Sequence, residues 1–374
     1  MKPSLTVSTP PAPTTKVQVD QHLKTRQLKA TTLLVVLSLL LVVSILLNVG
    51  MGAVQIRPAE VASILLSRVG VDTSVPFAGR QEAVLMAIRL PRVLLGVLVG
   101  ASLAVSGAAM QGLFRNPLAA PGLLGVSSGA ALAATGIIVF GSALPLGLRD
   151  PLGSWLLPAA AFAGSLIVTL FVYSIATRSG RTDVGTMLLA GVAINALAGS
   201  GTGLLVFVAD DAQLRDITFW SLGSLGGITW TRLTAAAPFM LAAMFLLPQL
   251  AKGLNAFLLG ESEARHLGVD VQVIKLATVF LAAAAVGAAV SVAGIIGFVG
   301  LVVPHLIRMV VGPNHHVLLP ASLLLGASLL LLADLFARMV VIPAELPIGI
   351  VTSLVGGPFF LWLLLQGRQR LGGL

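Results

Sequence analysis

Long stretches without a charged side chain recur along this chain and constrain its fold more than any other feature. The first, Ala30–Ile56, is followed by eight more. A helix needs about 20 apolar residues to cross a bilayer, so each stretch is long enough to span one. With 57% hydrophobic and 10% charged residues, the chain cannot be a soluble enzyme. The sequence predicts an all-α integral membrane protein. The eight further stretches are Val93–Phe114, Asn116–Leu148, Pro151–Thr177, Val184–Ala209, Leu233–Ala251, Leu276–Pro304, Met309–Ala333 and Leu346–Gly367.

One of these stretches is too long for a single span. From Leu276 the apolar run continues to Ile307 and, as one helix, would be about 48 Å long, against a hydrocarbon core of about 30 Å. Gly294, Gly297 and Gly300 offer a break near its middle. The sequence therefore predicts a span ending near Ala293, a shorter one ending near Arg308, and about ten transmembrane helices in all.

The formal charge of +9 is explained by membrane topology. Ten spans place both termini on one side, and with that side cytoplasmic the inner segments hold most Lys and Arg residues, as the positive-inside rule requires. Residues 1–29, rich in Pro, Thr and basic side chains, are expected to form a disordered cytoplasmic tail. Nothing in the charge calls for a nucleic-acid partner, and membrane lipid is the expected surrounding.

Small residues recur every fourth position along the fifth predicted span, at Gly191, Asn195, Gly199 and Gly203. Such spacing lets two backbones approach closely. Two interpretations remain open: packing within one subunit, or a face that lines a path or a dimer contact. Asn195 favours the second, because hydrocarbon does not tolerate a free amide.

The segment 252–275 is the longest charged connection after the tail. Its centre, Leu259–Gly268, predicts two short helices separated by glycines. A connection between spans needs only a few residues, so the segment favours a docking surface over a solvated loop.

Several chemistries are excluded by what the sequence lacks. It has no cysteine, no Gly-x4-Gly-Lys-Ser/Thr and no His-Glu-x-x-His. We therefore expect no catalytic residue, no metal site and no cofactor on this chain. Asp334 lies close to the membrane interior one turn before Arg338, which predicts a local ion pair. An ion-coupled secondary transporter, the alternative of another class, would show more intramembrane acids.

Three ordered motifs together resemble one family, the permease subunits of ABC importers for ferric siderophores, haem and cobalamin. The resemblance runs from about residue 30 to the C-terminus. The motifs are Arg89–Arg92 with Ser106–Gln111 and Arg115–Gly125; Gly294–Leu301 with Pro304, His305 and Arg308; and Glu345–Gly349 with Gly357–Phe360.

The resemblance implies a permease domain over residues 30–370 that acts as a homodimer in the bacterial cytoplasmic membrane. Two separate ATPase subunits would hold ATP and Mg, and one periplasmic or lipid-anchored substrate-binding protein would dock on the other side. The implied translocation path carries the stripe Gly191, Asn195, Gly199 and Gly203, and the cytoplasmic gate is Asn116 and Leu118. The implied ATPase-coupling residues are Leu259, Gly260, Glu261, Glu263, Arg265, Leu267 and Gly268, and the binding-protein docking residues are Arg89, Arg92 and Arg338.

Two details qualify the resemblance. Before the fifth span, where the cobalamin branch has Ser-Thr-Ser, this chain has Asp183–Thr186, so a second gate element is not matched. Asn116–Gly125 resembles the haem and cobalamin branches more than most siderophore permeases, and the Pro358–Trp362 ending resembles haem permeases. Haem permeases are also the commoner relatives. Haem is therefore the first substrate expectation and a ferric siderophore the second, with cobalamin as the alternative.

Overall fold

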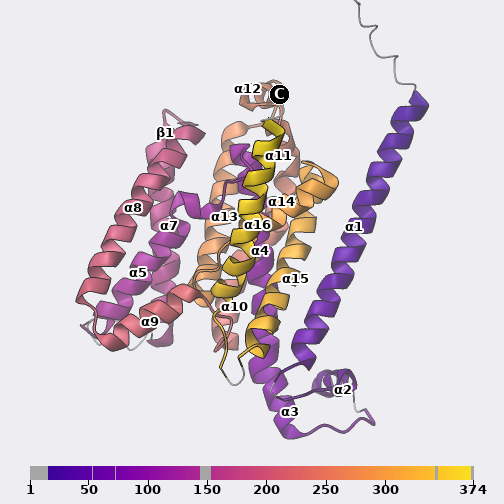
Figure 1. Cartoon of the computed structure of the whole chain (residues 1–374), viewed down its shortest axis with the longest axis vertical. Helices are drawn as coiled ribbons and strands as arrows, with labels where there is room; N and C mark the ends of the chain where they lie inside the picture. The colour runs from indigo at the N-terminus through magenta and orange to yellow at the C-terminus, as the bar shows by residue number, and fades with distance from the viewer. Residues whose placement is uncertain (1–15, 53, 72, 144–152, 342–343, 372–374) are drawn as a thin grey trace, which may run out of the picture.

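The computed structural model describes residues 16–371, apart from 53, 72, 144–152 and 342–343. Most of these residues are helical. The only sheet among them is a hairpin of two strands, each two residues long (Figure 1). The first half contains α1 (Lys16–Gly50), α2 (Pro58–Arg68), α3 (Gly79–Val84), the π-helical turn η1 (Leu85–Arg89), α4 (Leu90–Phe114), η2 (Pro121–Leu124), α5 (Val126–Phe140), η3 (Gly141–Ala143), η4 (Gly153–Trp155), α7 (Leu156–Ala176), β1 (Thr177–Arg178) and β2 (Arg181–Thr182). The second half contains α8 (Val184–Val208), α9 (Asp211–Leu222), α10 (Trp230–Leu246), η5 (Leu247–Leu250), α11 (Ala251–Phe257), α12 (Glu261–His266), α13 (Val271–Ala293), α14 (Val299–Val311), α15 (His315–Met339) and α16 (Ile348–Leu371).

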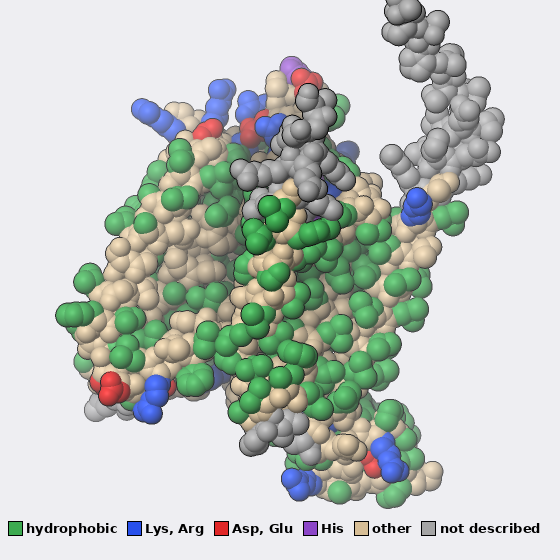
Figure 2. Space-filling view, in the orientation of Figure 1, with side chains coloured by type: hydrophobic (Ala, Val, Ile, Leu, Met, Phe, Trp, Pro, Cys, Tyr) green, Lys and Arg blue, Asp and Glu red, His purple; other side chains and the backbone are tan. Residues whose placement is uncertain are grey.

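Eight helical stretches of the described chain are long and apolar enough to cross a membrane, and α14 and α16 add two shorter apolar helices. Together they account for the ten predicted spans. Figure 2 shows an apolar surface between two ends where the charged side chains gather. One end carries α12, the start of α1 and the end of α16, and the other carries α2, α3 and α9 (Figure 1). We call these the α12 end and the α2 end. Both termini of the described chain lie at the α12 end.

Small residues set how closely the central helices approach. A side chain at Gly100 of α4 would collide with the backbone of Gly326 in α15, and one at Gly107 would collide with Gly300 in α14. Glycine at these positions therefore lets α4 pack directly on both helices, as small residues do inside membranes. On the other side of the molecule, α5, α7 and α8 form a second group (Figure 1).

The predicted break in the long apolar run is present. Helix α13 ends at Ala293, and Gly294 and Phe298 have φ angles of +69° and +65°. These left-handed conformations turn the chain before α14 begins at Val299. The break converts one overlong helix into two elements that fit the bilayer.

Two sequence expectations need correction. Helix α1 begins at Lys16, so residues 16–29, expected as disordered tail, are helical; residues 1–15 lie outside the described residues. An existing helix extends at little cost, and this basic stretch contains no Pro or Gly to stop it. Helix α9 was not expected in the connection before the sixth span. A capping box starts this helix: Asp210 accepts the Gln213 N–H, and Gln213 accepts the Asp210 N–H. The Asp-x-x-Gln spacing is the sequence signal that could have predicted it.

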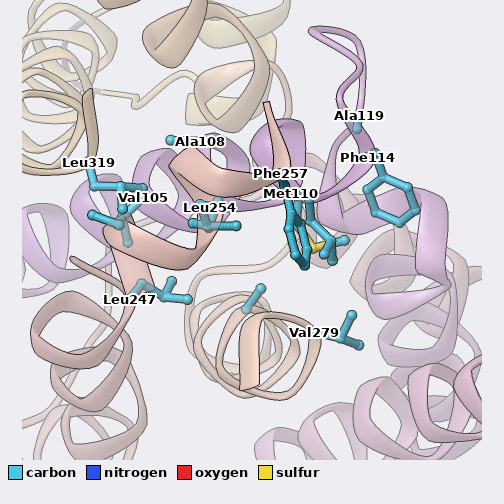
Figure 3. Packing of buried hydrophobic residues seen from close by; sticks show 14 of the residues in the cluster. Val105, Ala108, Met110, Phe114, Ala119, Leu247, Leu254, Phe257, Val279 and Leu319 are labelled. Atoms are coloured by element: carbon cyan, nitrogen blue, oxygen red, sulfur yellow. The ribbon is translucent and has the colours of Figure 1, made fainter. Parts of the chain in front are cut away.

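The largest buried cluster lies where α4, α11, α13 and α15 meet, near the α12 end. Figure 3 shows Phe257 of α11 against Met110 of α4; Leu254, Val279 and Leu319 belong to the same cluster. Leu254 and Phe257 are almost fully buried, so α11 is held firmly in the body of the protein. The segment that follows it starts from a rigid base.

Candidate coupling surface and translocation path

The stretch Leu259–Gly268, predicted to form two short helices, contains one, α12 (Glu261–His266); α11 ends before it at Phe257. The prediction of a second helix there is wrong, because the residues between Gly260 and Gly268 are enough for only one short helix. Gly260 and Gly268 on either side of α12 have φ angles of +118° and +79°, which favour glycine. Ala264 is fully buried beneath α12, whereas Leu259 and Leu267 are 67% and 64% exposed. Two large exposed leucines next to Glu261, Glu263 and Arg265 make an apolar spot with a charged rim, as a docking surface requires.

Helix α12 is tied to α13 by one buried lysine. Lys275, in the second turn of α13, is 1% exposed. Its Nζ lies 2.8 Å from the Glu261 carboxylate and donates to the Thr182 carbonyl oxygen at 2.7 Å. Lys275 ends the charged segment 252–275 in the sequence, and the structure buries it at the base of α12. The only sequence sign of its role was its position at the start of a long apolar run.

Thr182 belongs to the hairpin that leads directly into α8. The next residue, Asp183, caps α8 by accepting the Thr186 N–H at 2.6 Å. That hydrogen bond lowers the pKa of the Asp183 carboxyl below its ordinary value. The Asp183–Thr186 sequence, which matched no second gate element, is therefore the capped start of α8.

The predicted gate residues form a tight turn after α4. Arg115 ends α4 in a left-handed conformation, and the Asn116 Oδ1 accepts the Leu118 N–H at 2.9 Å. The Asn116 side chain closes this turn. Leu118 at the turn is 42% exposed. Arg115 also lies beside Gly260, so the gate turn and the coupling segment are neighbours.

The predicted stripe on α8 divides into two parts. A side chain at Gly191 would collide with the backbone carbonyl of Leu123. The Asn195 amide donates to Gly122 O at 3.1 Å and accepts from Ser128 Oγ at 2.5 Å. These two residues pack against η2 and α5 within the subunit, and their place on a translocation path stays a prediction. Gly199 and Gly203 are exposed, and a β-carbon at either position would meet no other atom within 4 Å, so this half of the stripe is open.

The three arginines predicted to dock a binding protein are not free. Arg89 is 4% exposed and donates to the carbonyl oxygens of Val49, Gly50 and Val54. Arg92 is 7% exposed and lies 2.8 Å from Asp334 and 2.9 Å from Glu345.

Arg338 pairs with Asp334 at 3.2 Å, as its spacing predicted, and also donates to Asn48. Acids and carbonyls distant in the sequence therefore already partner all three guanidinium groups within the subunit, and docking of a binding protein by these arginines stays a prediction. Sequence reasoning missed Glu345 and Asn48 as partners. Glu345 opens the third family motif, while nothing in the sequence marked Asn48.

No group of three or more His, Cys, Asp or Glu residues within the described ranges is placed to hold a metal ion. The fold and these sites define a polytopic helical membrane protein with a charged segment around α12 at one end and an exposed, glycine-bearing face on α8. The chain belongs to the FecCD transport family, whose model matches residues 40–366.

Individual relatives agree with this family. The chain is 51% identical over 286 residues to the hemin transport system permease protein HmuU of Yersinia pestis, covering 76% of this chain and 84% of the relative. It is 46% identical over 289 residues to the cobalamin import system permease protein BtuC of Halobacterium salinarum, covering 77% and 75%. A solved structure of a metal-chelate type ABC transporter in an inward-facing conformation is 33% identical, with a TM-score of 0.76 over 90% of this chain and 99% of that one.

Proposed function

We propose that this chain is the permease subunit of an ATP-driven importer that carries an iron chelate across the bacterial cytoplasmic membrane. Haem is the first candidate, because the hemin permease relative shares 51% of the aligned residues. A ferric siderophore is the second candidate. Cobalamin is the alternative that the 46% identical cobalamin permease supports.

The observation that carries this proposal is the segment around α12. Leu259 and Leu267 expose large apolar side chains at the two ends of α12, a short charged helix anchored to the body. Such a surface suits a groove on a partner protein. We assign it to a separate ATPase, two copies of which bind the permease dimer and hold ATP and Mg; this chain itself supplies no catalytic group. The α12 end, with both termini, then faces the cytoplasm.

A second copy of the chain completes the path in this proposal. The open face of α8 carries Gly199 and Gly203, and Leu189, Val192 and Phe207 on the same helix are more than half exposed. This face suits a wall shared between two subunits, closed at the α12 end by Asn116 and Leu118. The substrate-binding protein docks at the α2 end, where Glu345, 45% exposed in its side chain, is held in place by Arg92.

An ion-coupled carrier is disfavoured by the state of Asp334. This buried carboxylate is already engaged by Arg92 and Arg338, so its oxygens serve a structural contact between α4 and α15.

Reconstitution with its ATPase and binding protein tests substrate and assembly together. The purified complex should contain two permease chains, two ATPases and one binding protein by native mass spectrometry. Uptake of haem into vesicles should be reduced by excess unlabelled haem and not by cobalamin or a ferric siderophore. Competition by cobalamin alone would move the assignment to that alternative, and a complex without an ATPase would reject the importer.

A further inference from the structure

The buried Lys275 joins three elements that are separate in the sequence. Its ammonium group contacts Glu261, the first residue of α12, and the carbonyl of Thr182, the last residue of the hairpin before α8. Lys275 itself belongs to α13. One cation therefore touches the coupling helix on one side and the entrance to the open-faced helix on the other.

A second side chain of α13 reinforces the same contact. Gln272, one helical turn before Lys275, accepts the backbone N–H of Thr182 at 3.1 Å. Residues three apart lie on one helix face. Gln272 therefore accepts the Thr182 N–H while Lys275 donates to the Thr182 carbonyl. Thr182 also donates to the Tyr173 hydroxyl at 3.0 Å and is only 4% exposed. The hairpin cannot move relative to α13 without breaking these bonds.

The link to α8 is short. Asp183 follows Thr182, its backbone N–H donates to Ala176 O at 2.9 Å, and its side chain caps α8. Only one residue therefore separates the Lys275 contact from the first turn of α8. In the other direction, Glu261 is 31% exposed in its side chain and lies two residues from Leu259.

We infer that Lys275 is a positioning residue that transmits movement of α12 to the start of α8. This inference rests on the proposed function, because it takes α12 as the surface that the ATPase moves and α8 as a wall of the path. The physical basis is that a buried, doubly partnered ammonium is costly to separate from its acceptors. When α12 shifts, the lowest-energy response is for the hairpin and the first turn of α8 to shift with it.

Lys275→Met tests this transmission, because methionine keeps most of the volume and removes the donor. Without the ammonium, Glu261 and the Thr182 carbonyl lose their shared partner, and breaking a buried pair in this way is strongly unfavourable. Movement of α12 would then no longer reach α8, so we expect substrate uptake by the reconstituted complex to fall at least about tenfold. ATP hydrolysis should stay within about twofold of the parent, so more ATP is used per substrate moved. The matched control is Lys252→Met, which changes an exposed lysine of the same segment and should leave both rates unchanged.

A distance measurement separates transmission from a purely structural role. The chain has no cysteine, so spin labels can be placed at Ser262→Cys in α12 and Ser179→Cys at the exposed turn of the hairpin. In the parent the distance between the labels should be the same with and without ATP, because the two elements move together. In Lys275→Met it should broaden and change when ATP binds. An unchanged distance in the variant, together with normal uptake, would overturn the inference.

A milder variant covers the case in which Lys275→Met does not accumulate. Glu261→Gln keeps the side-chain shape and removes only the charge, so it should give the same pattern of lost uptake and retained hydrolysis to a smaller degree. Normal uptake in Glu261→Gln would also count against transmission. If the parent complex itself shows no ATP-driven uptake, the proposed function fails, and that result is distinct from failure of the Lys275 link.

Discussion

Arg92 in α4 donates through Nη2 to Asp334 in α15 at 2.8 Å, across 242 residues of sequence. Its Nε contacts the same carboxylate at 3.1 Å, which gives the two-pronged geometry that makes arginine–carboxylate pairs strong. Arg338, one turn after Asp334 in α15, pairs with the same carboxylate. Arg92 donates through its other terminal nitrogen, Nη1, to Glu345. One buried carboxylate therefore holds two guanidinium groups at the α2 end.

Replacing Asp334 should be the most destabilising change in this cluster. Asp334→Ala leaves Arg92 and Arg338 buried without their shared carboxylate, and losing one partner of a buried pair costs about 3–5 kcal/mol. The matched control is Glu82→Ala, which breaks the more exposed pair with Arg68 and should cost at most about 1 kcal/mol. Thermal unfolding in detergent measures both, and equal melting temperatures for the two variants would contradict this ranking.

The exposed leucine of the coupling surface should matter for coupling and not for folding. Leu259→Asp places a charge where we propose that a partner groove closes over an apolar side chain, so ATP-driven uptake should be abolished while the permease remains dimeric. Val69→Asp is the control, because Val69 is 74% exposed at the opposite end of the molecule. Normal uptake in Leu259→Asp would remove α12 from the coupling mechanism.

The two halves of the α8 stripe should respond differently to one methyl group. Gly191→Ala forces a side chain against the Leu123 carbonyl and should destabilise the protein by about 1–3 kcal/mol, as overpacking does. Gly199→Ala meets open space and should leave the melting temperature unchanged. Thermal unfolding of the pair checks this, and the reverse order would show that the contact near Leu123 is misassigned.

A larger side chain at Gly199 tests the path. Gly199→Leu should fold, because nothing in the subunit opposes it, and should abolish uptake by narrowing the path or separating the subunits. Crosslinking across the dimer axis distinguishes these two causes. A dimeric, fully active Gly199→Leu variant would show that the open face of α8 meets only lipid.

Hydropathy was sufficient to predict the spans, because the need to bury about 20 apolar residues is a local property of the sequence. The break after Ala293 followed from the same reasoning, since helix length and bilayer thickness disagree over that run. Glycine spacing also located the short helix α12 between Gly260 and Gly268, although the second helix expected in that stretch is not present. Each of these features depends on residues close together in the chain.

Features that depend on distant partners were not predictable in this way. The resemblance implied a docking role for Arg89 and Arg92, but the sequence does not show the carboxylate or carbonyl that meets each of them. Nor does it show that Glu261 and the Thr182 carbonyl meet Lys275. Asn195 suggested a path, but its amide is satisfied by Gly122 and Ser128. A single sequence identifies polar and charged groups that are unfavourable to bury. Only the fold shows which hydrogen-bond or ion-pair partners offset that burial.

Dependence on ATP is the most direct test of the central claim, that a partner ATPase drives transport through this permease. Vesicles containing the permease, its ATPase and its binding protein should be loaded either with ATP and Mg or with an inward proton or sodium gradient and no nucleotide. We expect haem uptake only in the ATP-loaded vesicles. Uptake of equal rate in the ATP-free vesicles under the ion gradient would contradict the claim and identify a secondary transporter.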